Sequence, residues 1–489
     1  MQTLFGQALA RHAKNDHVPA AIATPGRDIG YRELLGAANS CAAWLMRSRC
    51  GAAELVGITI ADEYAHMVAS IALLLLGIPQ ICLSTRDPES MRLRLAQRID
   101  VRRVIVADAK HAVDGVPTLL LPPEILEADG NARPVDALDA DPDAPAVYFA
   151  SSGTTGDSKV FALSQRALAW RAERIAESEQ IGAGYRALTL VSVEETPGKS
   201  KRLHTLYLGY TSVLANASRA QMSPQQLCTA LDVTCLELSV LSLTSIVLDH
   251  TQDDRFPQRT TVYASGSRVP ANLRQSFKDR FAMPVYVHYG AREFGRIATT
   301  YPLDEADDDD SVGAPVPWID LEIVDGNGDA VARGEVGELR VRSECMIHEY
   351  YRDPVATPRH FRSGWFYPGD LASITGRGTL RIHGRSDEMM NLSSIKIFPL
   401  EIERVLEEHP AVRAAAAFAK SSAALGDIPI AAVELHDSAR VSVDELMARA
   451  RDRLGMRAPR KIFVVEALPR SAAGKILKRE LAALLAPGA

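Results

Sequence analysis

The N-terminal third of the chain alternates between two hydrophobic periodicities. Apolar side chains at helical spacing predict two helices, at residues 31–47 and 66–76, and a glycine ends the second. Short apolar runs predict buried strands, at residues 55–60, 101–107 and 146–149. Strands that alternate with helices are typical of parallel sheets. Residues 115–145 are rich in Pro, Asp and Ala and are predicted to be a long surface connection.

The pattern changes in the C-terminal part of the chain. Two alternating stretches around a Gly-Asn-Gly turn predict an antiparallel hairpin over residues 319–342. Beyond the short polar segment 384–387, a further unit is predicted, with helices at residues 397–409 and 443–454 and strands at residues 412–418, 430–435 and 461–465. The sequence therefore predicts an α/β fold with two domains. Residues 1–385 form a large domain of mixed and parallel sheets with a hairpin-rich subdomain, and residues 386–489 form a small, mobile α+β domain.

Composition and charge favour a globular protein and disfavour a nucleic-acid-binding or membrane-spanning one. The chain has 489 residues, of which 47% are hydrophobic and 24% charged, which is typical of a globular protein. The net charge of −6 does not favour binding to nucleic acid, which needs clustered positive charge. The longest apolar run, residues 67–78, is shorter than the ~20 residues of a membrane span. The N-terminus predicts an amphipathic helix without the apolar core of a signal peptide, and the six cysteines form no C-x-x-C pair. These features favour a cytoplasmic location.

The strongest candidate for chemistry is the segment 151–159, Ser-Ser-Gly-Thr-Thr-Gly-Asp-Ser-Lys, which directly follows a predicted strand. Small residues let a backbone approach a phosphate, hydroxyl groups donate hydrogen bonds, and a lysine adds positive charge. The spacing is not that of a P-loop, because Lys159 lies at the wrong distance from the glycines. From these residues alone, a phosphate site and an ordinary Ser/Thr/Gly loop both remain open.

Three further segments carry candidate residues. Asp370 ends the run Gly-Trp-Phe-Tyr-Pro-Gly-Asp, and is either a turn residue or a carboxylate that accepts hydrogen bonds from a sugar diol. Arg385 and Asp387 lie at the predicted domain boundary, and Lys475 lies in the segment 469–475 near the C-terminus. The acidic run 307–310 is predicted to be a solvated loop rather than a metal site.

Taken in this order, the four segments resemble the adenylate-forming superfamily, which includes acyl-CoA synthetases, the adenylation domains of nonribosomal peptide synthetases and beetle luciferase. Residues 264–270 are similar to the adenine-pocket loop of that family, and residues 288–295 to its Y-G-x-T-E segment. Residues 334–339 are similar to the hairpin that precedes its ribose-binding Asp. The resemblance covers nearly the whole chain and implies the fold, the chemistry and the site residues described next.

The resemblance implies two half-reactions. A carboxylate attacks the α-phosphate of ATP to give an acyl-adenylate and pyrophosphate, and a thiol then displaces AMP. ATP and Mg²⁺ are implied, with a small carboxylic acid as substrate and CoA as the thiol. The alternatives are the phosphopantetheine of an acyl carrier protein, an acyl-AMP ligase that stops at the adenylate, and a non-catalytic nucleotide-binding relic. A monomer or homodimer is expected, with no nucleic-acid partner.

The resemblance also implies roles for individual residues. The phosphates of ATP would be bound by Ser152, Gly153, Thr154, Thr155, Gly156 and Lys159. The adenine would be bound by Gly266, Ser267, Tyr289 and Gly290. Glu293 would bind Mg²⁺, Asp370 would accept both ribose hydroxyls, and Arg385 would add a ribose or phosphate contact. Lys475 would bridge the carboxylate, the ribose and the α-phosphate. Asp387 would be the hinge about which the small domain rotates between half-reactions.

Four departures from the family limit what carries over. Arg292 replaces a Thr or Ser that contacts the α-phosphate, so it is a catalytic candidate for either that phosphate or a substrate carboxylate. Lys159 lies between Ser and Val rather than Pro and Gly, and Ser394 replaces a glycine that lines the thiol tunnel. The polar stretch 192–204 replaces an apolar pocket wall. It is interpreted as an exposed, mobile loop, with a polar pocket wall or a docking face for an acidic carrier protein as the alternative. The Asp that secures an α-amino group is not evident, which disfavours an amino acid substrate.

Overall fold

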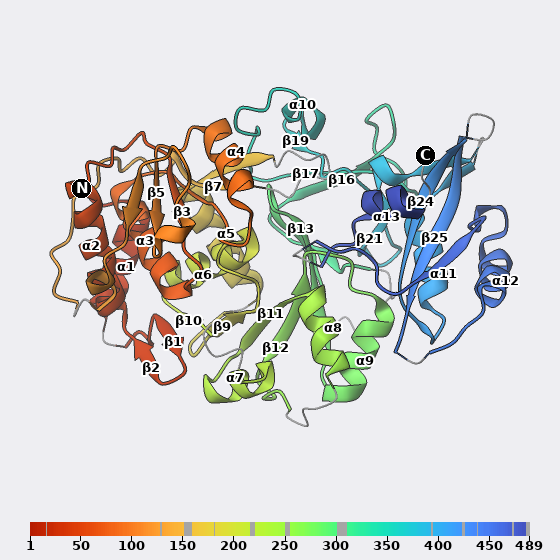
Figure 1. The fold of residues 1–489 in the computed structure, drawn as a ribbon, viewed down its shortest axis with the longest axis horizontal. Coiled ribbons are helices and arrows are strands. Elements are labelled where there is room, and N and C mark those ends of the chain that lie inside the picture. Colours follow the sequence, from red (N-terminus) through yellow and green to blue (C-terminus); the bar gives the residue numbers. More distant parts are fainter. Residues whose placement is uncertain are drawn as a thin grey trace.

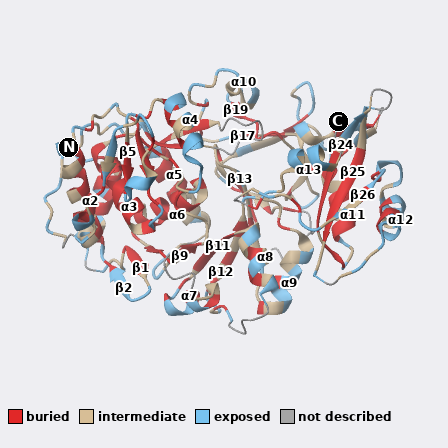
Figure 2. Ribbon diagram, viewed as in Figure 1, coloured by how far each residue is buried: buried red, intermediate tan, exposed pale blue. Residues whose placement is uncertain are grey.

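The structure is a computed structural model that describes residues 1–15, 17–127, 130–150, 159–179, 181–215, 221–249, 255–300, 311–392, 395–422, 426–437, 439–471 and 474–485. Its described strands form four sheets, which follow one another from the red N-terminal end of the chain to the blue C-terminal end (Figure 1). The buried residues are concentrated within and between these layers (Figure 2). No helix in the described ranges is both long and apolar enough to cross a bilayer.

The first sheet is six-stranded, in the order β6-β5-β3-β4-β7-β8. Its strands are β3 (Val56–Thr59), β4 (Gln80–Cys82), β5 (Arg103–Val106), β6 (Thr118–Leu120), β7 (Pro145–Ala150) and β8 (Val160–Ser164). All pairs are parallel except β7 with β8, which confirms the predicted parallel sheet. The helices around it are α1 (Leu4–Ala13), α2 (Tyr31–Arg47), α3 (Glu63–Leu76) and α4 (Glu89–Ile99).

The local sequence explains where α3 begins and ends, whereas it does not reveal strand β6. Asp62 caps the helix by accepting a hydrogen bond from the Ala65 amide, and Gly77 ends it at a φ of 71°. The connection predicted over residues 115–145 is wrong in part, because it contains β6 and a 3₁₀ turn, Pro123–Glu127. The apolar run in β6 is too short to be recognised without its partner strand β5, with which it pairs in parallel.

The second sheet is nine-stranded, in the order β15-β14-β13-β12-β11-β9-β10-β1-β2. Its strands are β1 (Ile22–Thr24), β2 (Arg27–Ile29), β9 (Arg186–Thr189), β10 (Thr211–Val213), β11 (Cys235–Ser239), β12 (Thr261–Ser265), β13 (Val285–Ala291), β14 (Gly295–Thr299) and β15 (Ala314–Pro315). The helices of this region are α5 (Gln165–Ser178), α6 (Thr196–Tyr207), α7 (Pro224–Ala230), α8 (Val240–Leu248) and α9 (Ala271–Phe281). Because β11, β12 and β13 are parallel, their carboxyl ends meet at one edge of the sheet.

The third sheet is antiparallel and carries the predicted hairpin. Its strands are β16 (Asp320–Val324), β17 (Gly337–Arg342), β18 (Phe361–Arg362), β19 (Trp365–Phe366), β20 (Asp370–Ile374) and β21 (Leu380–Arg385), with the short helix α10 (Thr357–His360) beside them. The pairing of β16 with β17 confirms the hairpin. We call everything up to residue 385 the N-terminal body.

The fourth sheet and its helices form what we call the C-terminal unit, residues 386–485. Its strands are β22 (Met390–Leu392), β23 (Ile395–Ile397), β24 (Val412–Ser422), β25 (Gly426–Leu435) and β26 (Ile462–Val465), and its helices are α11 (Pro399–Glu407), α12 (Val443–Leu454) and α13 (Lys478–Leu485). A hydrophobic core made only of these residues holds the unit together. The predicted α/β fold class, with a small α+β unit at the C-terminus, is confirmed. The acidic run 307–310 and Ser394 lie outside the described residues.

The interpretation of residues 192–204 as an exposed loop is wrong, because most of this stretch forms α6 and its basic side chains are buried. Lys199 donates a hydrogen bond to Gln80 Oε1 at 2.7 Å, Lys201 lies 2.7 Å from Glu237 Oε1, and Arg202 pairs with Glu63. Buried charges persist when partners from other elements compensate them. A string of basic residues resembles a solvated surface when those partners are far away in the sequence.

Candidate active site

The centre of the candidate site is a contact between two sheets. Tyr289 lies near the end of β13, and its hydroxyl donates to Asp370 Oδ2 at 2.5 Å. Asp370 is the first residue of β20 and follows Gly369, whose φ of 83° turns the chain into the strand. Burial raises the pKa of Asp370, while Arg385 and the Tyr289 hydroxyl act in the opposite direction. Asp370 is therefore a buried carboxylate with a fixed hydrogen-bond donor and a charged guanidinium in contact with it.

Arg385 joins Asp370 to the predicted hinge. It ends β21 opposite Asp370, and its guanidinium lies 3.4 Å from Asp370 Oδ1 and 3.2 Å from Asp387 Oδ1. It also donates to the Pro368 carbonyl oxygen at 2.5 Å. Arg385 therefore contacts both of the predicted acidic residues, Asp370 of the site and Asp387 of the hinge.

Two glycines of the predicted adenine site are required by the backbone. The ladder between β13 and β14 shifts register at Tyr289 and Gly290, and a Cβ on Gly290 would lie 2.1 Å from the Gly295 carbonyl oxygen. Gly266 directly follows β12 and has a φ of 91°. Gly290 lets β14 approach β13 closely, and Gly266 lets the chain turn with a positive φ where β12 ends.

A second cluster surrounds Lys159, the lysine of the predicted phosphate segment. Lys159 Nζ is 2.6 Å from His360 Nε2 and lies over the Tyr350 ring at 5.3 Å from its centre. His360 Nδ1 is 2.9 Å from the Tyr367 carbonyl oxygen, to which it must donate, so Nε2 accepts from the lysine. The Tyr350 hydroxyl donates to Glu293 Oε1 at 2.9 Å. Burial lowers the pKa of both Lys159 and His360.

The predicted phosphate residues Ser152, Gly153, Thr154, Thr155 and Gly156 lie outside the described residues. The strands β7 and β8, which precede and follow this segment in the sequence, pair with Ala150 opposite Val160, so Lys159 lies near the end of β7. Arg292 donates to the Ala150 carbonyl oxygen at 3.3 Å, so its side chain also points to this place. Arg171 of α5 donates to the Glu293 carbonyl oxygen at 2.7 Å and so fixes the backbone of the Mg²⁺ candidate.

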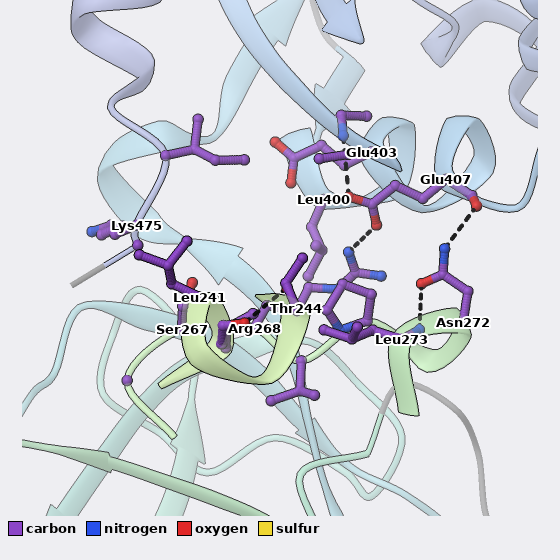
Figure 3. Close-up of a pocket in the computed structure, with 18 of the residues that line it drawn as sticks. Leu241, Thr244, Ser267, Arg268, Asn272, Leu273, Leu400, Glu403, Glu407 and Lys475 are labelled. Atoms are coloured by element: carbon purple, nitrogen blue, oxygen red, sulfur yellow. Dashed lines mark hydrogen bonds and ion pairs between the residues drawn. The ribbon is translucent and has the colours of Figure 1, made fainter. Parts of the chain in front are cut away.

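Lys475 reaches the site from the C-terminal unit. A cavity of about 1230 Å³ lies between this unit and the N-terminal body. Its lining includes the predicted residues Gly266, Ser267, Tyr289, Gly290, Asp370, Arg385 and Lys475. Figure 3 shows Lys475 close to Leu241 and Ser267. The preceding residue, Gly474, packs so tightly that a Cβ there would lie 2.8 Å from Leu241 Cβ. The charge of Lys475 adds to those that oppose the rise in the pKa of Asp370 caused by burial.

The site therefore has two parts. The structure brings seven predicted residues together in the cavity, while Lys159, Arg292 and Glu293 belong to the neighbouring cluster and do not line it. Sequence reasoning missed Tyr350, His360 and Arg171. The signals available were weak, since Tyr350 is one of thirteen tyrosines and His360 one of twelve histidines, and neither lies in a recognisable motif.

A buried carboxylate, an aromatic ring at a sheet edge and a lysine from a separate unit line one cavity, as the resemblance to the adenylate-forming superfamily predicts. The sequence matches the AMP-binding enzyme family over residues 9–351 and the AMP-binding enzyme C-terminal domain over residues 401–475. The chain belongs to the AMP-binding enzyme family.

Named relatives cover almost the whole chain. It is 27% identical to an indoleacetate–CoA ligase of Aromatoleum aromaticum, with 97% of each chain covered. It is 25% identical to a 4-chlorobenzoate–CoA ligase of an Arthrobacter species, with 98% of this chain and 95% of the relative covered. Among solved structures, o-succinylbenzoate CoA synthetase of Bacillus subtilis, in complex with its acyl-adenylate intermediate, has a TM-score of 0.86 at 24% identity over 97% of both chains. That structure has the same fold.

Proposed function

We propose that this enzyme activates a small carboxylic acid with ATP to an acyl-adenylate and pyrophosphate, and then transfers the acyl group to CoA with release of AMP. The observation that carries the proposal is the cavity in which Lys475 of the C-terminal unit meets Tyr289, Asp370 and Arg385 of the N-terminal body. The ligase activities of the full-length relatives support the CoA half-reaction.

The nucleoside binds at the carboxyl edge of the nine-stranded sheet. Asp370 accepts hydrogen bonds from both ribose hydroxyls, and the Tyr289 ring flanks the adenine over Gly266, Ser267 and Gly290. The hydrogen bond from Tyr289 to Asp370 orients both groups before the nucleotide arrives. Arg385 compensates the buried carboxylate and reaches the ribose or the phosphates.

The phosphates extend toward Lys159. Its ammonium, held by His360, supplies positive charge, and the hydroxyl and amide groups of the segment 152–156 donate hydrogen bonds. Arg292 points to the start of that segment, which favours the α-phosphate over a substrate carboxylate as its partner. The acid and the triphosphate are both anions, so these charges are needed as the pentavalent transition state develops.

Glu293 fits the Mg²⁺ role. Tyr350 occupies one carboxylate oxygen, which leaves the other for the metal. No group of three or more His, Cys, Asp or Glu side chains that could hold a metal is found among the described residues. Mg²⁺ needs few protein ligands, so Glu293 alone would hold the ion on the protein side. When bound, the ion supplies charge that stabilises the departing pyrophosphate.

Lys475 completes the adenylation arrangement by bridging the attacking carboxylate and the α-phosphate. The C-terminal unit then rotates about Asp387, which withdraws Lys475 and admits the thiol. We place the domain boundary at residues 385/386, and we expect a cytoplasmic monomer or homodimer. A carrier-protein phosphopantetheine is the second candidate for the thiol acceptor.

The test is to incubate the full chain with ATP, Mg²⁺, CoA and a panel of aromatic, short aliphatic and long-chain acids. AMP and an acyl-CoA, identified by mass, are expected with one class of acid. Pyrophosphate without thioester would mean an acyl-AMP ligase, and loading of a phosphopantetheinylated carrier but not CoA would mean a carrier-dependent enzyme. No acid-dependent AMP or pyrophosphate with any acid would contradict the proposal.

A further inference from the structure

One ion pair joins the predicted adenine loop to the C-terminal unit. Arg268, two residues after Gly266, pairs with the Glu407 carboxylate at the end of α11 (Figure 3). Asn272 of α9 donates to the Glu407 carbonyl oxygen at 3.4 Å. Two side chains of the N-terminal body therefore hold a single residue of the C-terminal unit.

The two oxygens of the Glu407 carboxylate have different partners. Oε1 accepts from the Ala415 amide at 3.2 Å within the C-terminal unit, and Oε2 pairs with Arg268 across the interface. The Glu407 side chain is only 9% exposed, and burial raises its pKa while Arg268 lowers it. Because the Oε1 contact is internal, a rotation of the C-terminal unit keeps it and breaks the Oε2 contact and the hydrogen bond from Asn272.

Ion pairs made by α11 connect Glu407 to the segment that carries Lys475. Glu403, one turn earlier in this helix, lies 2.8 Å from Lys478 Nζ, which is also 2.8 Å from Glu388 Oε2 beside the hinge. Lys478 is three residues from Lys475, so α11, the hinge and the Lys475 segment are tied together. Holding Glu407 against Arg268 therefore keeps Lys475 in the cavity.

We propose that Arg268 and Glu407 form an interdomain latch that stabilises the adenylation arrangement and breaks before the thiol step. Arg268 is a positioning residue, since it acts on Lys475 through Glu407 and α11. Because it shares a loop with Gly266 and Ser267, the latch also couples the nucleotide site to the orientation of the C-terminal unit. The latch rests on the proposed function, because it is defined by the adenylation and thiol-transfer steps of the proposed reaction.

The test separates the half-reactions. Acid-dependent ATP–pyrophosphate exchange measures adenylation, and thioester formation from a synthetic acyl-adenylate and CoA measures transfer. Arg268→Met and Glu407→Gln should each slow exchange about tenfold while transfer is unchanged or faster. The glutamine keeps an acceptor for the Ala415 amide. The exchanged pair Arg268→Glu with Glu407→Arg should regain a large part of the exchange rate.

A matched control is available on the same helix. Arg457 lies 3.1 Å from Glu401 of α11 within the C-terminal unit, so Arg457→Met removes a comparable pair without touching the interface. It should change neither half-reaction. Equal losses in exchange and transfer in Arg268→Met, or no recovery in the exchanged pair, would overturn the latch.

A scattering measurement tests the latch without any acid. With ATP and Mg²⁺ present, Arg268→Met should show a broader, more extended small-angle X-ray scattering profile than the wild type, and Arg457→Met should not. Superimposable profiles of Arg268→Met and wild type would overturn the proposal. If no acid supports exchange by the wild type, the proposed function fails, and the scattering comparison still decides on the latch.

Discussion

Tyr289 and Asp370 are 81 positions apart in the sequence, and the hydroxyl of one donates to the carboxylate of the other at 2.5 Å. The contact joins the mixed nine-stranded sheet to the antiparallel sheet that follows it. Because the aromatic ring and the carboxylate are fixed by each other, the nucleoside would meet a site that needs little reorganisation.

Tyr289→Phe should raise the KM for ATP about three- to tenfold with little change in kcat, since one hydrogen bond to a buried carboxylate is lost while the ring remains. Tyr289→Ala should cost clearly more, because the ring that flanks the adenine is also lost. The ATP dependence of pyrophosphate exchange measures both. Equal effects of the two substitutions would show that the ring does not contact the nucleotide.

Lys475→Ala should slow acid-dependent pyrophosphate exchange by a hundredfold or more, since a charge at the reacting phosphate is lost (about 10²–10³ for one such contact). Transfer from a preformed acyl-adenylate to CoA should stay near the wild-type rate, because Lys475 is withdrawn in that step. An equal loss in both reactions would contradict this role and would mean that the substitution disturbs the fold.

His360 is predicted to position Lys159. His360→Ala should raise the KM for ATP about threefold to tenfold, since the lysine loses its fixed acceptor, and His360→Gln should retain most of the affinity. The histidine accepts only when neutral, and burial lowers its pKa below the usual 6.5. The affinity for ATP should therefore begin to fall only below pH 6.5. In His360→Gln the affinity should depend less on pH in this range. An unchanged KM for ATP in His360→Ala would refute the role.

Lys199 is predicted to reduce stability at neutral pH. Burial lowers its pKa to about 8 in the folded chain, against about 10.4 when unfolded. Between pH 8 and about 10.4, the unfolded chain binds a proton at Lys199 that the folded chain does not. The free energy of unfolding therefore rises with pH in this range. Below pH 8 the lysine is charged in both states, and the folded chain bears the full cost of burying the charge. Lys199→Met removes a cost of about 3 kcal/mol, and Ser70 still donates to Gln80 Oε1.

Urea unfolding at pH 7 and at pH 9.5 measures this effect. Lys199→Met should be at least as stable as the wild type at pH 7, and its stability should rise less between the two pH values. Marked destabilisation with an unchanged pH dependence would mean that the ammonium–amide bond outweighs the desolvation of the charge.

Elements with strong local signals were predicted well. The helix over residues 31–47 has the predicted bounds, since it combines regular apolar spacing with glycine before it. The helix at Val443–Leu454 also matches, and Ser442 caps it. The short strand β6 and the helix α6 were missed because both depend on tertiary partners, the one on a neighbouring strand and the other on buried counter-charges.

Residues of the candidate site could be predicted from the sequence only where they lie in a recognisable motif. Asp370, Arg385 and Lys475 each lie in a recognisable segment, and the structure brings them to one cavity. Tyr350 and His360 entered the site through side-chain contacts across the fold, which no local pattern encodes. The pairing of Arg268 with Glu407 is of the same kind, since it joins residues 139 positions apart.

The central claim is tested most directly by ATP–pyrophosphate exchange with labelled pyrophosphate, measured for the wild type and for Lys475→Ala over a panel of acids. The account predicts exchange that depends on one class of carboxylic acid and on Mg²⁺ and is lost in the variant. Exchange that is absent with every acid, while ATP still binds, would contradict it.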